Sequence, residues 1–348
     1  MLSPTLTPLT PYCTTALPSR CYATAVYPHS SLSVPESLLY LASCRGGPIR
    51  LHSLLHPSLL SSYRLVNAHT EAHMAPHSLL IPSGSPHTFV AGSDSQLSFF
   101  DVNRSGSGPV RALRTIPTRR SPATTTTMKG LVAALALGSA RVLAAGTNTR
   151  HVGLYAADGT GDVIGVFCVP DDPPDEAGGG VSQLLWSACE RYLYIAERRS
   201  DVVSVYDIRN TGLRVASLRR RAAATNQRMA VSLLDGELVG GGMDGVVRIW
   251  RGEEGGEPVG AWKAHDDVVT AAAVHPFGEI VATCSGSRKT FGLDVGRSSG
   301  SGGGGGSSSD DSDEDTVMDS SIPWDNSLKI WEIPKAHGPH SSAEDKEP

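Results

Sequence analysis

The sequence is poor in charged residues, in aromatic residues and in long apolar runs. Only 19% of its 348 residues are charged and 6% are aromatic. No run of about 18 or more apolar residues occurs, so that no membrane span is expected. Residues 1–18 lack a basic segment followed by an apolar one, and therefore do not match a secretory signal. Glycine (37) and proline (23) are plentiful, which is typical of many short strands joined by tight turns.

Metal-binding patterns are also missing. None of the cysteines forms a C-x-x-C pair, and several lie within apolar strand patterns: Cys13, Cys21, Cys44, Cys168, Cys189 and Cys284. This favours buried, reduced thiols in a cytosolic or nuclear protein. His69, His73 and His77 have helical spacing, but Pro76 argues against a helix there, so that we predict no metal site.

Motifs of common enzyme classes are absent as well. The chain has no G-x-S-x-G, no P-loop, no H-E-x-x-H and no dinucleotide fingerprint on a strand–helix unit. The glycine run at 302–306 is a linker, because no Lys-Ser/Thr and no helix follow it. We therefore expect a protein that is not an enzyme and that needs no cofactor.

A short pattern recurs six times along the chain. A β-rich run meets a polar turn, and a second β-rich run ends on a large apolar residue, most clearly at 238–250 and 89–101. The copies end at Leu51, Phe100, Tyr155, Tyr206, Trp250 and Trp331. A turn residue stands six positions before each end: Arg45, Asp94, Thr149, Ser200, Asp244 and Asp325. Hairpins repeated about every 40–50 residues predict an all-β protein, a β-propeller.

The spacing of the hairpins defines the organisation of the chain. Their ends are 49, 55, 51, 44 and 81 residues apart, and the excess in the last interval is the segment 298–323. That segment is Gly/Ser-rich and then acidic, so that we predict a disordered loop within the last blade. We assign residues 21–333 to the propeller, and 1–20 and 334–348 to disordered ends. Leu131–Leu137 has a helix-like composition, but its place in the repeat favours a strand.

The repeats leave the number of blades open. Six blades are recognisable, and seven are expected if an N-terminal blade is missing or degenerate, because the first copy begins almost at Met1. A ring that is short of one blade would expose a strand edge.

The negative charge is concentrated in the predicted insertion. The chain has a net charge of −5, but without the six acids of residues 298–323 it holds 29 acidic and 30 basic residues. Acids lie three positions after Ser307, Ser308 and Ser312, which suits phosphorylation by an acidophilic kinase. A solubilising spacer is the alternative interpretation of this segment.

Basic residues gather in two loops of the predicted propeller. One pair lies in a hairpin turn, and a run of three lies between blades, close to two amides and a further arginine. RNA recognition needs cations for phosphates and amides for base edges. We therefore predict an RNA contact formed by Arg198, Arg199, Arg219, Arg220, Arg221, Asn226, Gln227 and Arg228. Solvated turns with surface arginines are the alternative, and Arg228 would then anchor a loop by donating to carbonyls.

Several landmarks resemble a known family. They are residues 62–69, residues 198–209 followed by Thr225-Asn-Gln-Arg228, and residues 275–288 followed by the acidic insertion and a final Leu-x-Ile-Trp strand. Ala264-His265 resembles the Gly-His position of a WD repeat. Over residues 21–333 the chain resembles WD-repeat proteins, and more narrowly the telomerase Cajal body protein family and its fungal relatives. It departs from them at the N-terminus, where that family has another blade and a long polar extension.

The resemblance implies a non-catalytic nuclear scaffold. Animal members bind small Cajal body RNAs, including telomerase RNA, and help to place the ribonucleoprotein in the nucleus, whereas fungal relatives resemble factors linked to splicing. We expect a monomer that binds a small nuclear or Cajal body-type RNA and its ribonucleoprotein proteins, binds other proteins through the propeller faces, and does not bind membranes. Its expected location is the nucleus, with or without a cytoplasmic pool. The alternative is a protein-only interaction propeller, for example in spliceosome assembly or as a ubiquitin-ligase adaptor.

Overall fold

The computed structural model describes residues 10–116, 127–171, 173–210, 213–287 and 325–332. These residues form strands and four short 3-10 helices: η1 (Pro35–Ser37), η2 (Ala157–Gly159), η3 (Pro174–Glu176) and η4 (Ile208–Asn210). The predicted insertion 298–323 and tail 334–348 lie outside the described residues, as do Ser307, Ser308 and Ser312.

The strands form six antiparallel sheets in chain order. The first is β1 (Cys21–Val26), β2 (Leu39–Cys44), β3 (Ile49–Ser53) and β4 (Leu59–Tyr63). The second is β5 (Ser78–Leu80), β6 (Thr88–Ser93), β7 (Gln96–Asp101) and β8 (Arg111–Arg114). The third is β9 (Val132–Leu137), β10 (Leu143–Thr147), β11 (His151–Tyr155) and β12 (Val163–Cys168).

The remaining three sheets follow the same order. The fourth is β13 (Val181–Trp186), β14 (Tyr192–Glu197), β15 (Val203–Asp207) and β16 (Arg214–Leu218). The fifth is β17 (Val231–Leu234), β18 (Glu237–Gly241), β19 (Val246–Arg251) and β20 (Gly260–Lys263). The sixth has three strands among the described residues, β21 (Val269–Val274), β22 (Ile280–Ser285) and β23 (Leu328–Glu332).

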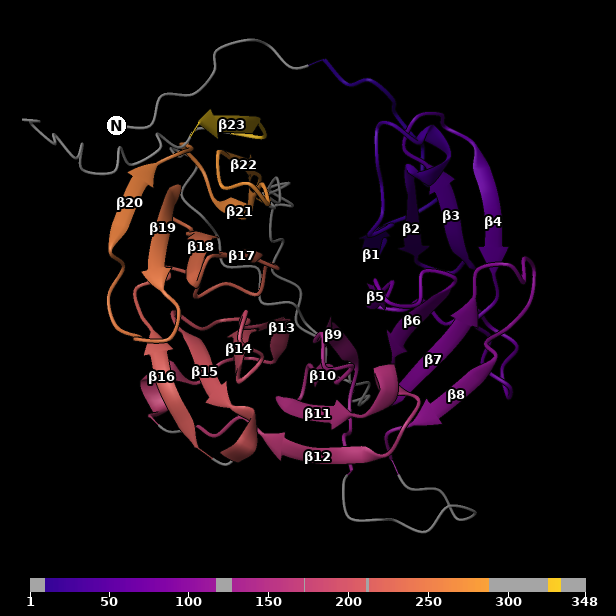
Figure 1. The fold of residues 1–348 in the computed structure, drawn as a ribbon, viewed down its shortest axis with the longest axis horizontal. Helices are drawn as coiled ribbons and strands as arrows, with labels where there is room; N and C mark the ends of the chain where they lie inside the picture. Colours follow the sequence, from indigo (N-terminus) through magenta and orange to yellow (C-terminus); the bar gives the residue numbers. More distant parts are fainter. Residues whose placement is uncertain (1–9, 117–126, 172, 211–212, 288–324, 333–348) are drawn as a thin grey trace, which may run out of the picture.

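The six sheets are the blades of a propeller (Figure 1). The first strand of each blade lies towards the centre, and blades one and six lie at the two ends of an open arc (Figure 1). In blade six the outer position belongs to β23, whereas each of the other blades has a fourth strand there. The predicted all-β propeller with six blades is thus confirmed, and the described chain forms no seventh blade.

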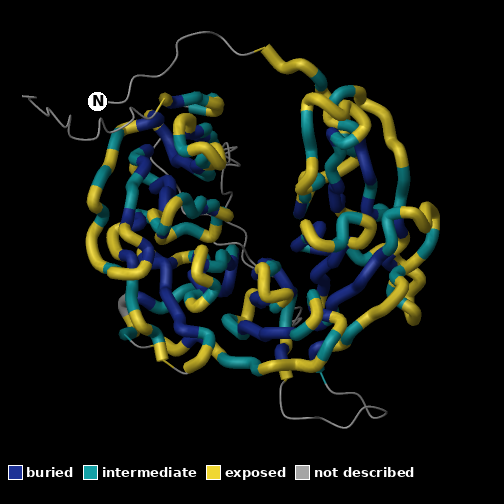
Figure 2. Tube along the Cα trace, in the orientation of Figure 1, coloured by how far each residue is buried: buried dark blue, intermediate teal, exposed yellow. Residues whose placement is uncertain are grey.

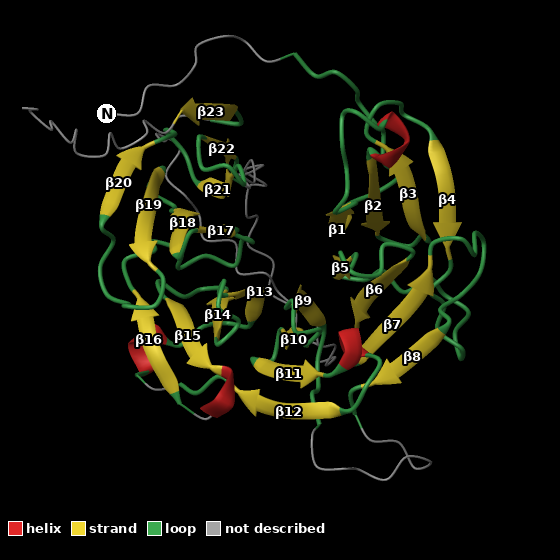
Figure 3. Ribbon diagram, in the orientation of Figure 1, coloured by secondary structure: helices red, strands yellow, loops and turns green. Residues whose placement is uncertain are grey.

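The register predicted from the repeats is also confirmed. Each of the six turn residues lies between the second and third strands of its blade, and Figure 3 shows the chain almost entirely as strands and loops. The segment with a helix-like composition is strand β9, which pairs with β10 from Val132 to Leu137. The repeat therefore outweighs local composition at this place.

The core consists of clusters that each combine residues of two neighbouring blades. Figure 2 shows where the buried residues lie along the chain. Inner strands are covered on both faces, and all five residues of β10 are buried. Between blades one and two the rings of Phe89 and Phe100 stack at 4.7 Å, and the ring of Tyr63 packs edge-on against that of Phe89 at 5.0 Å. Such aromatic pairs add specific geometry to the burial of apolar surface.

Side-chain hydrogen bonds reinforce these contacts between the blades. Each joins one blade to an inner strand of the next: Ser78 Oγ to Val132 O (2.9 Å), Gln183 Nε2 to Val231 O (2.8 Å) and Ser232 Oγ to Ala272 O (2.7 Å). The buried polar groups of the inner strands thereby find partners, and the relative position of the blades is fixed.

Blade six contains a buried polar network. The ring of His265 bridges Asp325 Oδ2 at 3.0 Å and Thr283 Oγ1 at 2.8 Å. Trp331 Nε1 donates to the same threonine oxygen at 2.8 Å. The network connects β22, β23 and the segment that precedes β21, so that it holds the last blade together on both sides of the long insertion.

The order of the strands determines which loops share a face. Because the strands are antiparallel, turns between second and third strands lie on the same face as the connections from one blade to the next. We call this the connection face. The turns between first and second strands and between third and fourth strands lie on the opposite face.

Candidate nucleic-acid interface

The two basic loops that were predicted to contact RNA lie side by side on the connection face. The backbone N–H of Arg199, in the turn between β14 and β15, donates to Thr225 O at 2.9 Å. The N–H of Arg221 donates to Asp201 O at 2.9 Å, and that of Ala223 donates to Asp201 Oδ1 at 2.6 Å. The β14–β15 turn and the connection from β16 to β17 therefore form one hydrogen-bonded unit.

The structure corrects the role predicted for Arg221. Its side chain is 1% exposed and donates to Glu197 O at 3.2 Å and to Met229 O at 2.7 Å. Burial lowers its pKa to about 10. Arg221 cannot reach a phosphate from this position, and it anchors the loop through carbonyls, which is the role considered for Arg228 from the sequence.

Arg219 and Arg220 are exposed, but each has a protein carboxylate as its partner. Arg219 Nε lies 2.9 Å from Glu176 Oε1, and Arg220 Nε lies 2.8 Å from Glu257 Oε2. The carboxylate of Glu176 also pairs with Arg214 at 3.0 Å. The charges of this part of the loop are thus largely balanced within the protein.

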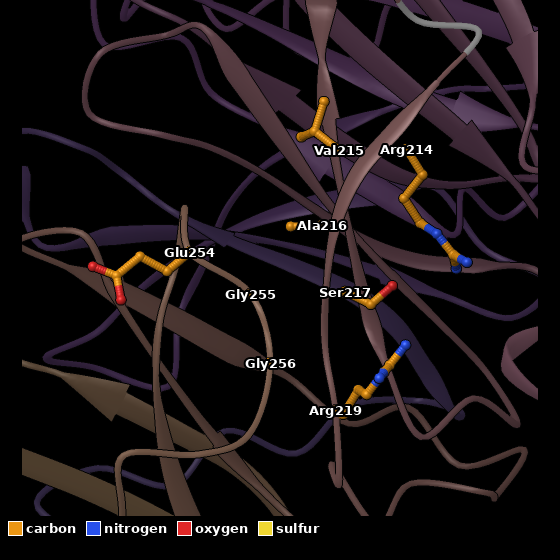
Figure 4. Close-up of a pocket in the computed structure, with 8 residues that line it drawn as sticks. All are labelled: Arg214, Val215, Ala216, Ser217, Arg219, Glu254, Gly255 and Gly256. Atoms are coloured by element: carbon orange, nitrogen blue, oxygen red, sulfur yellow. The ribbon is translucent and has the colours of Figure 1, made fainter.

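A shallow pocket adjoins these ion pairs (Figure 4). It has a volume of about 340 Å³ and is lined by Arg214, Val215, Ala216, Ser217, Arg219, Glu254, Gly255 and Gly256. The side chains of Arg214, Ser217 and Arg219 project to one side of β16, and that of Glu254 projects to the other (Figure 4). Since Ser217 Oγ also donates to Glu176 Oε2 at 3.0 Å, the polar groups of this wall already converge on one protein carboxylate.

Arg198, Arg199 and Arg228 are different. Arg199 and Arg228 are exposed and Arg198 is half-buried, and none of the three has a carboxylate at ion-pair distance among the residues described. Arg198 donates from Nη1 to the carbonyl of Asn226. Burial lowers the pKa of Arg198. For Arg228, whose surface is exposed, partial loss of hydration beside the neighbouring protein lowers the pKa first, and the charge of Arg198 lowers it further. These guanidinium groups are available to an external anion.

The two predicted amides have unequal surroundings. Asn226 is exposed, whereas Gln227 is half-buried and its Nε2 donates to Gly286 O, at the end of β22, at 2.6 Å. The backbone N–H of Gln227 donates to Thr225 Oγ1 at 3.1 Å. The side chain of Gln227 thus ties this loop to blade six, and only Asn226 presents its amide freely to solvent.

Sequence reasoning missed two aromatic residues near this site. The rings of Tyr22, in β1, and His77, directly before β5, stack with centroids 4.2 Å apart and planes 16° apart. The pKa of His77 is lowered by burial and then by the positive charges of Arg198 and Arg228. The sequence did contain a signal for His77. It directly precedes a predicted inner strand, and the fold brings every such position to the connection face.

Other kinds of site find no support in the described part of the chain. No group of three or more His, Cys, Asp or Glu residues there is arranged to hold a metal ion. No helix in the same residues is long and apolar enough to cross a membrane.

Comparison with known families and folds agrees with this geometry. A model of the WD domain, G-beta repeat, matches residues 256–290, which include His265 and Thr283 of the network in blade six. The solved structure of the computationally designed Ika8 protein superposes with a TM-score of 0.52 at 14% identity, over 90% of this chain and 71% of that one. This likeness concerns the fold alone. Propellers of the WD repeat are generally non-catalytic scaffolds.

Among curated proteins the chain is similar to members of two groups. It is 27% identical to guanine nucleotide-binding protein negative regulator 1 of Schizosaccharomyces pombe over 275 residues, which are 78% of this chain and 67% of that protein. It is 28% identical to telomerase Cajal body protein 1 of Rattus norvegicus over 274 residues, and 27% identical to the protein of that name in Homo sapiens over 271. These alignments cover 75% of this chain but 48% and 46% of the relatives, so that the chain spans about half their length. From the repeat match, the six-bladed fold and these relatives, the chain is a six-bladed β-propeller that contains a WD repeat at 256–290 and resembles the telomerase Cajal body protein family.

Proposed function

We propose that the protein is a non-catalytic nuclear scaffold that binds a small nuclear or Cajal body-type RNA and assists the assembly or localisation of its ribonucleoprotein. The similarity to telomerase Cajal body protein 1 supports this class of partner. The observation that carries the proposal is that three guanidinium groups on one face, those of Arg198, Arg199 and Arg228, have no carboxylate at ion-pair distance among the described residues. Cations without protein counter-charges suit a polyanion, and guanidinium groups match phosphate geometry.

The first test is recovery of RNA from cells. The tagged chain is cross-linked with ultraviolet light and the bound RNA is sequenced, with an unrelated WD-repeat propeller as the control. Small nuclear or telomerase-type RNAs should be enriched over that control. No enrichment of either class would overturn the proposal.

The second test is charge reversal on the connection face. The double variant Arg199→Glu with Arg228→Glu should lose most of this RNA, because two attractive interactions with phosphates become repulsive. A matched control is Arg104→Glu with Arg251→Glu on the opposite face, where the exposed Arg104 lies in the turn between β7 and β8 and the exposed Arg251 is the last residue of β19. This control should recover RNA as the unmodified chain does.

A protein-only interaction propeller is the second candidate. The fission yeast relative is named as a negative regulator of a guanine nucleotide-binding protein. Outer strands of this chain also expose apolar side chains that suit a protein partner, such as Ile164 in β12 (57%) and Val215 in β16 (51%). In that case the purified complexes contain proteins but no enriched RNA, and the charge-reversal double variant keeps the same protein partners.

A further inference from the structure

The connection face carries an aromatic pair and two arginines near its inner strands. Tyr22 belongs to blade one and His77 to the start of blade two, where its N–H donates to Gly92 O at 2.9 Å. A bulge between Cys21 and Ala23 sets Tyr22 apart from the regular ladder of β1 and β2. Both rings are half-buried, so that their stack retains surface towards solvent.

The arginines come from blades four and five, on the other side of the arc. Arg198 directly follows β14 in blade four, and Arg228 lies three positions before β17 in blade five. Arg198 donates from Nη1 to the carbonyl of Asn226, two positions before Arg228, so that the two arginines belong to one hydrogen-bonded unit of the connection face. After burial, the positive charges of both arginines lower the pKa of His77. No carboxylate forms an ion pair with either arginine within the described ranges, and the cluster is therefore short of negative charge.

We propose that this cluster of Tyr22, His77, Arg198 and Arg228 binds one nucleotide of single-stranded RNA. The two guanidinium groups hold a phosphate, and the base extends the Tyr22–His77 stack. Aromatic stacking with a flanking cation is the general mode by which single strands are bound. The inference rests on the proposed function, because it names the contact through which the face would hold RNA.

The test separates the charged contact from the stacking contact. Binding of fluorescently labelled single-stranded oligoribonucleotides to the full chain is measured by anisotropy at several salt concentrations. Arg198→Gln with Arg228→Gln should lower the affinity at least about tenfold and reduce the log–log salt slope by about 0.7 for each phosphate that is no longer neutralised. Tyr22→Leu should lower the affinity by about tenfold, because the base no longer stacks on a ring, and leave the slope unchanged.

Matched controls and distinct outcomes keep the inference testable. Arg104→Gln with Arg251→Gln and Tyr12→Leu, which removes a ring that is 81% exposed, should bind as the unmodified chain does. Circular dichroism checks that each variant is folded, and Arg228→Gln alone replaces the double variant if that one is unfolded. If the unmodified chain binds no RNA, the proposed function fails. If it binds RNA and the Tyr22 and arginine variants bind equally well, only this inference fails.

A second, independent observation concerns two cysteines in blade one. Cys21 and Cys44 are direct cross-strand partners in β1 and β2. The neighbouring hydrogen bond runs from Arg45 N to Arg20 O at 3.0 Å, which makes the cysteines a non-hydrogen-bonded pair. Such pairs have Cα atoms about 4.5 Å apart, within the range that a disulfide spans. The two thiols also interact directly. Burial and this interaction raise the pKa of Cys21, so that its thiolate fraction is low at neutral pH and its oxidation requires an excess of peroxide.

We infer that Cys21 and Cys44 form a reversible disulfide under peroxide stress. Hydrogen peroxide oxidises the exposed Cys21 thiol to a sulfenic acid and releases one water. The Cys44 sulfur then displaces the sulfenic oxygen as a second water, so that two thiols and one peroxide give one disulfide and two waters. The bond would fix β1 to β2 directly before Tyr22.

Peptide mapping without reduction tests this inference on the full chain. After peroxide treatment a cross-linked peptide containing Cys21 and Cys44 should appear, and dithiothreitol should remove it. Cys44→Ser should abolish it, whereas Cys189→Ser, which changes an exposed cysteine of blade four, should leave it intact. Separate alkylation of Cys21 and Cys44 after peroxide treatment would overturn the inference.

Discussion

Arg221 donates a hydrogen bond from Nη2 to the carbonyl oxygen of Met229 at 2.7 Å, and Nη1 donates to Glu197 O at 3.2 Å. Glu197 ends β14 in blade four, and Met229 precedes β17 in blade five. The buried guanidinium therefore links two blades through their backbones. With a pKa of about 10 the guanidinium stays charged at neutral pH. The dipoles of the two carbonyl groups stabilise its positive charge.

Arg221→Leu should reduce the free energy of unfolding by about 2 kcal/mol, because two carbonyls lose their buried donor. The neighbouring Arg220→Leu is the matched control. Its side chain is 76% exposed and its partner Glu257 is also exposed, so that we expect a change within about 0.5 kcal/mol. Urea denaturation followed by circular dichroism measures both. Equal effects of the two substitutions would contradict the structural role of Arg221.

Two glycines in blade five allow a test of local packing. Gly245 and Gly236 both have a positive φ, 74° and 82°. A Cβ at Gly245 would lie 2.1 Å from His265 O, whereas one at Gly236 would meet nothing within 4 Å. Gly236→Ala should thus cost about 1 kcal/mol from backbone strain alone. Gly245→Ala should cost clearly more, about 3 kcal/mol, because the backbone of the next blade must move. Thermal denaturation of the pair measures the difference, and similar melting temperatures would show that the turn adapts.

The sequence could predict the propeller because its signals are local. A turn residue and an alternating strand pair recur at a constant offset, and each is readable within a dozen residues. The outermost strands were not recognised. β8 spans Arg111–Arg114 and is mostly exposed, so that it lacks the apolar alternation that marks a strand. An outermost strand forms because the third strand of its blade offers a free edge for pairing. This cause lies in the folded blade and not in the strand's own sequence.

The candidate site could be predicted only in part, for a related reason. Topology brings inter-blade connections and hairpin turns to one face, and this follows from the repeat. The adjacent residues Arg219, Arg220 and Arg221 cannot be distinguished from the sequence, yet their surroundings in the structure differ. Arg219 meets Glu176, which is 43 residues away, whereas Arg221 is buried between two blades. The charge of Arg198 in blade four acts on His77 in blade two only because the blades are arranged around a common centre.

The network of blade six predicts a dependence of stability on acid. Burial alone would raise the pKa of Asp325, but hydrogen bonds from Ser327, from the Asp266 N–H and from His265 outweigh it and hold the pKa well below the ordinary 3.8. The carboxylate therefore stabilises the fold above about pH 4, and this contribution is lost progressively as the pH falls further. Asp325→Asn should be less stable than the unmodified chain at pH 6, and the difference should shrink towards pH 3.

Denaturation at a series of pH values tests this dependence. The control is Asp235→Asn, at an exposed turn of blade five, which should follow the profile of the unmodified chain. If Asp325→Asn shows the same loss of stability between pH 6 and pH 3 as the unmodified chain, the carboxylate does not carry the stabilisation assigned to it.

Removing the negative charge of Glu176 should strengthen RNA binding. Its carboxylate is 8% exposed and pairs with both Arg214 and Arg219. Glu176→Gln removes this counter-charge, so that the affinity for single-stranded RNA should rise about threefold, with a salt slope steeper by about 0.7 for each additional phosphate that is neutralised. Glu237→Gln removes an exposed carboxylate on the opposite face and should change neither quantity. If the two variants bind RNA alike, Arg219 does not reach the RNA, and the contact is confined to Arg198, Arg199 and Arg228.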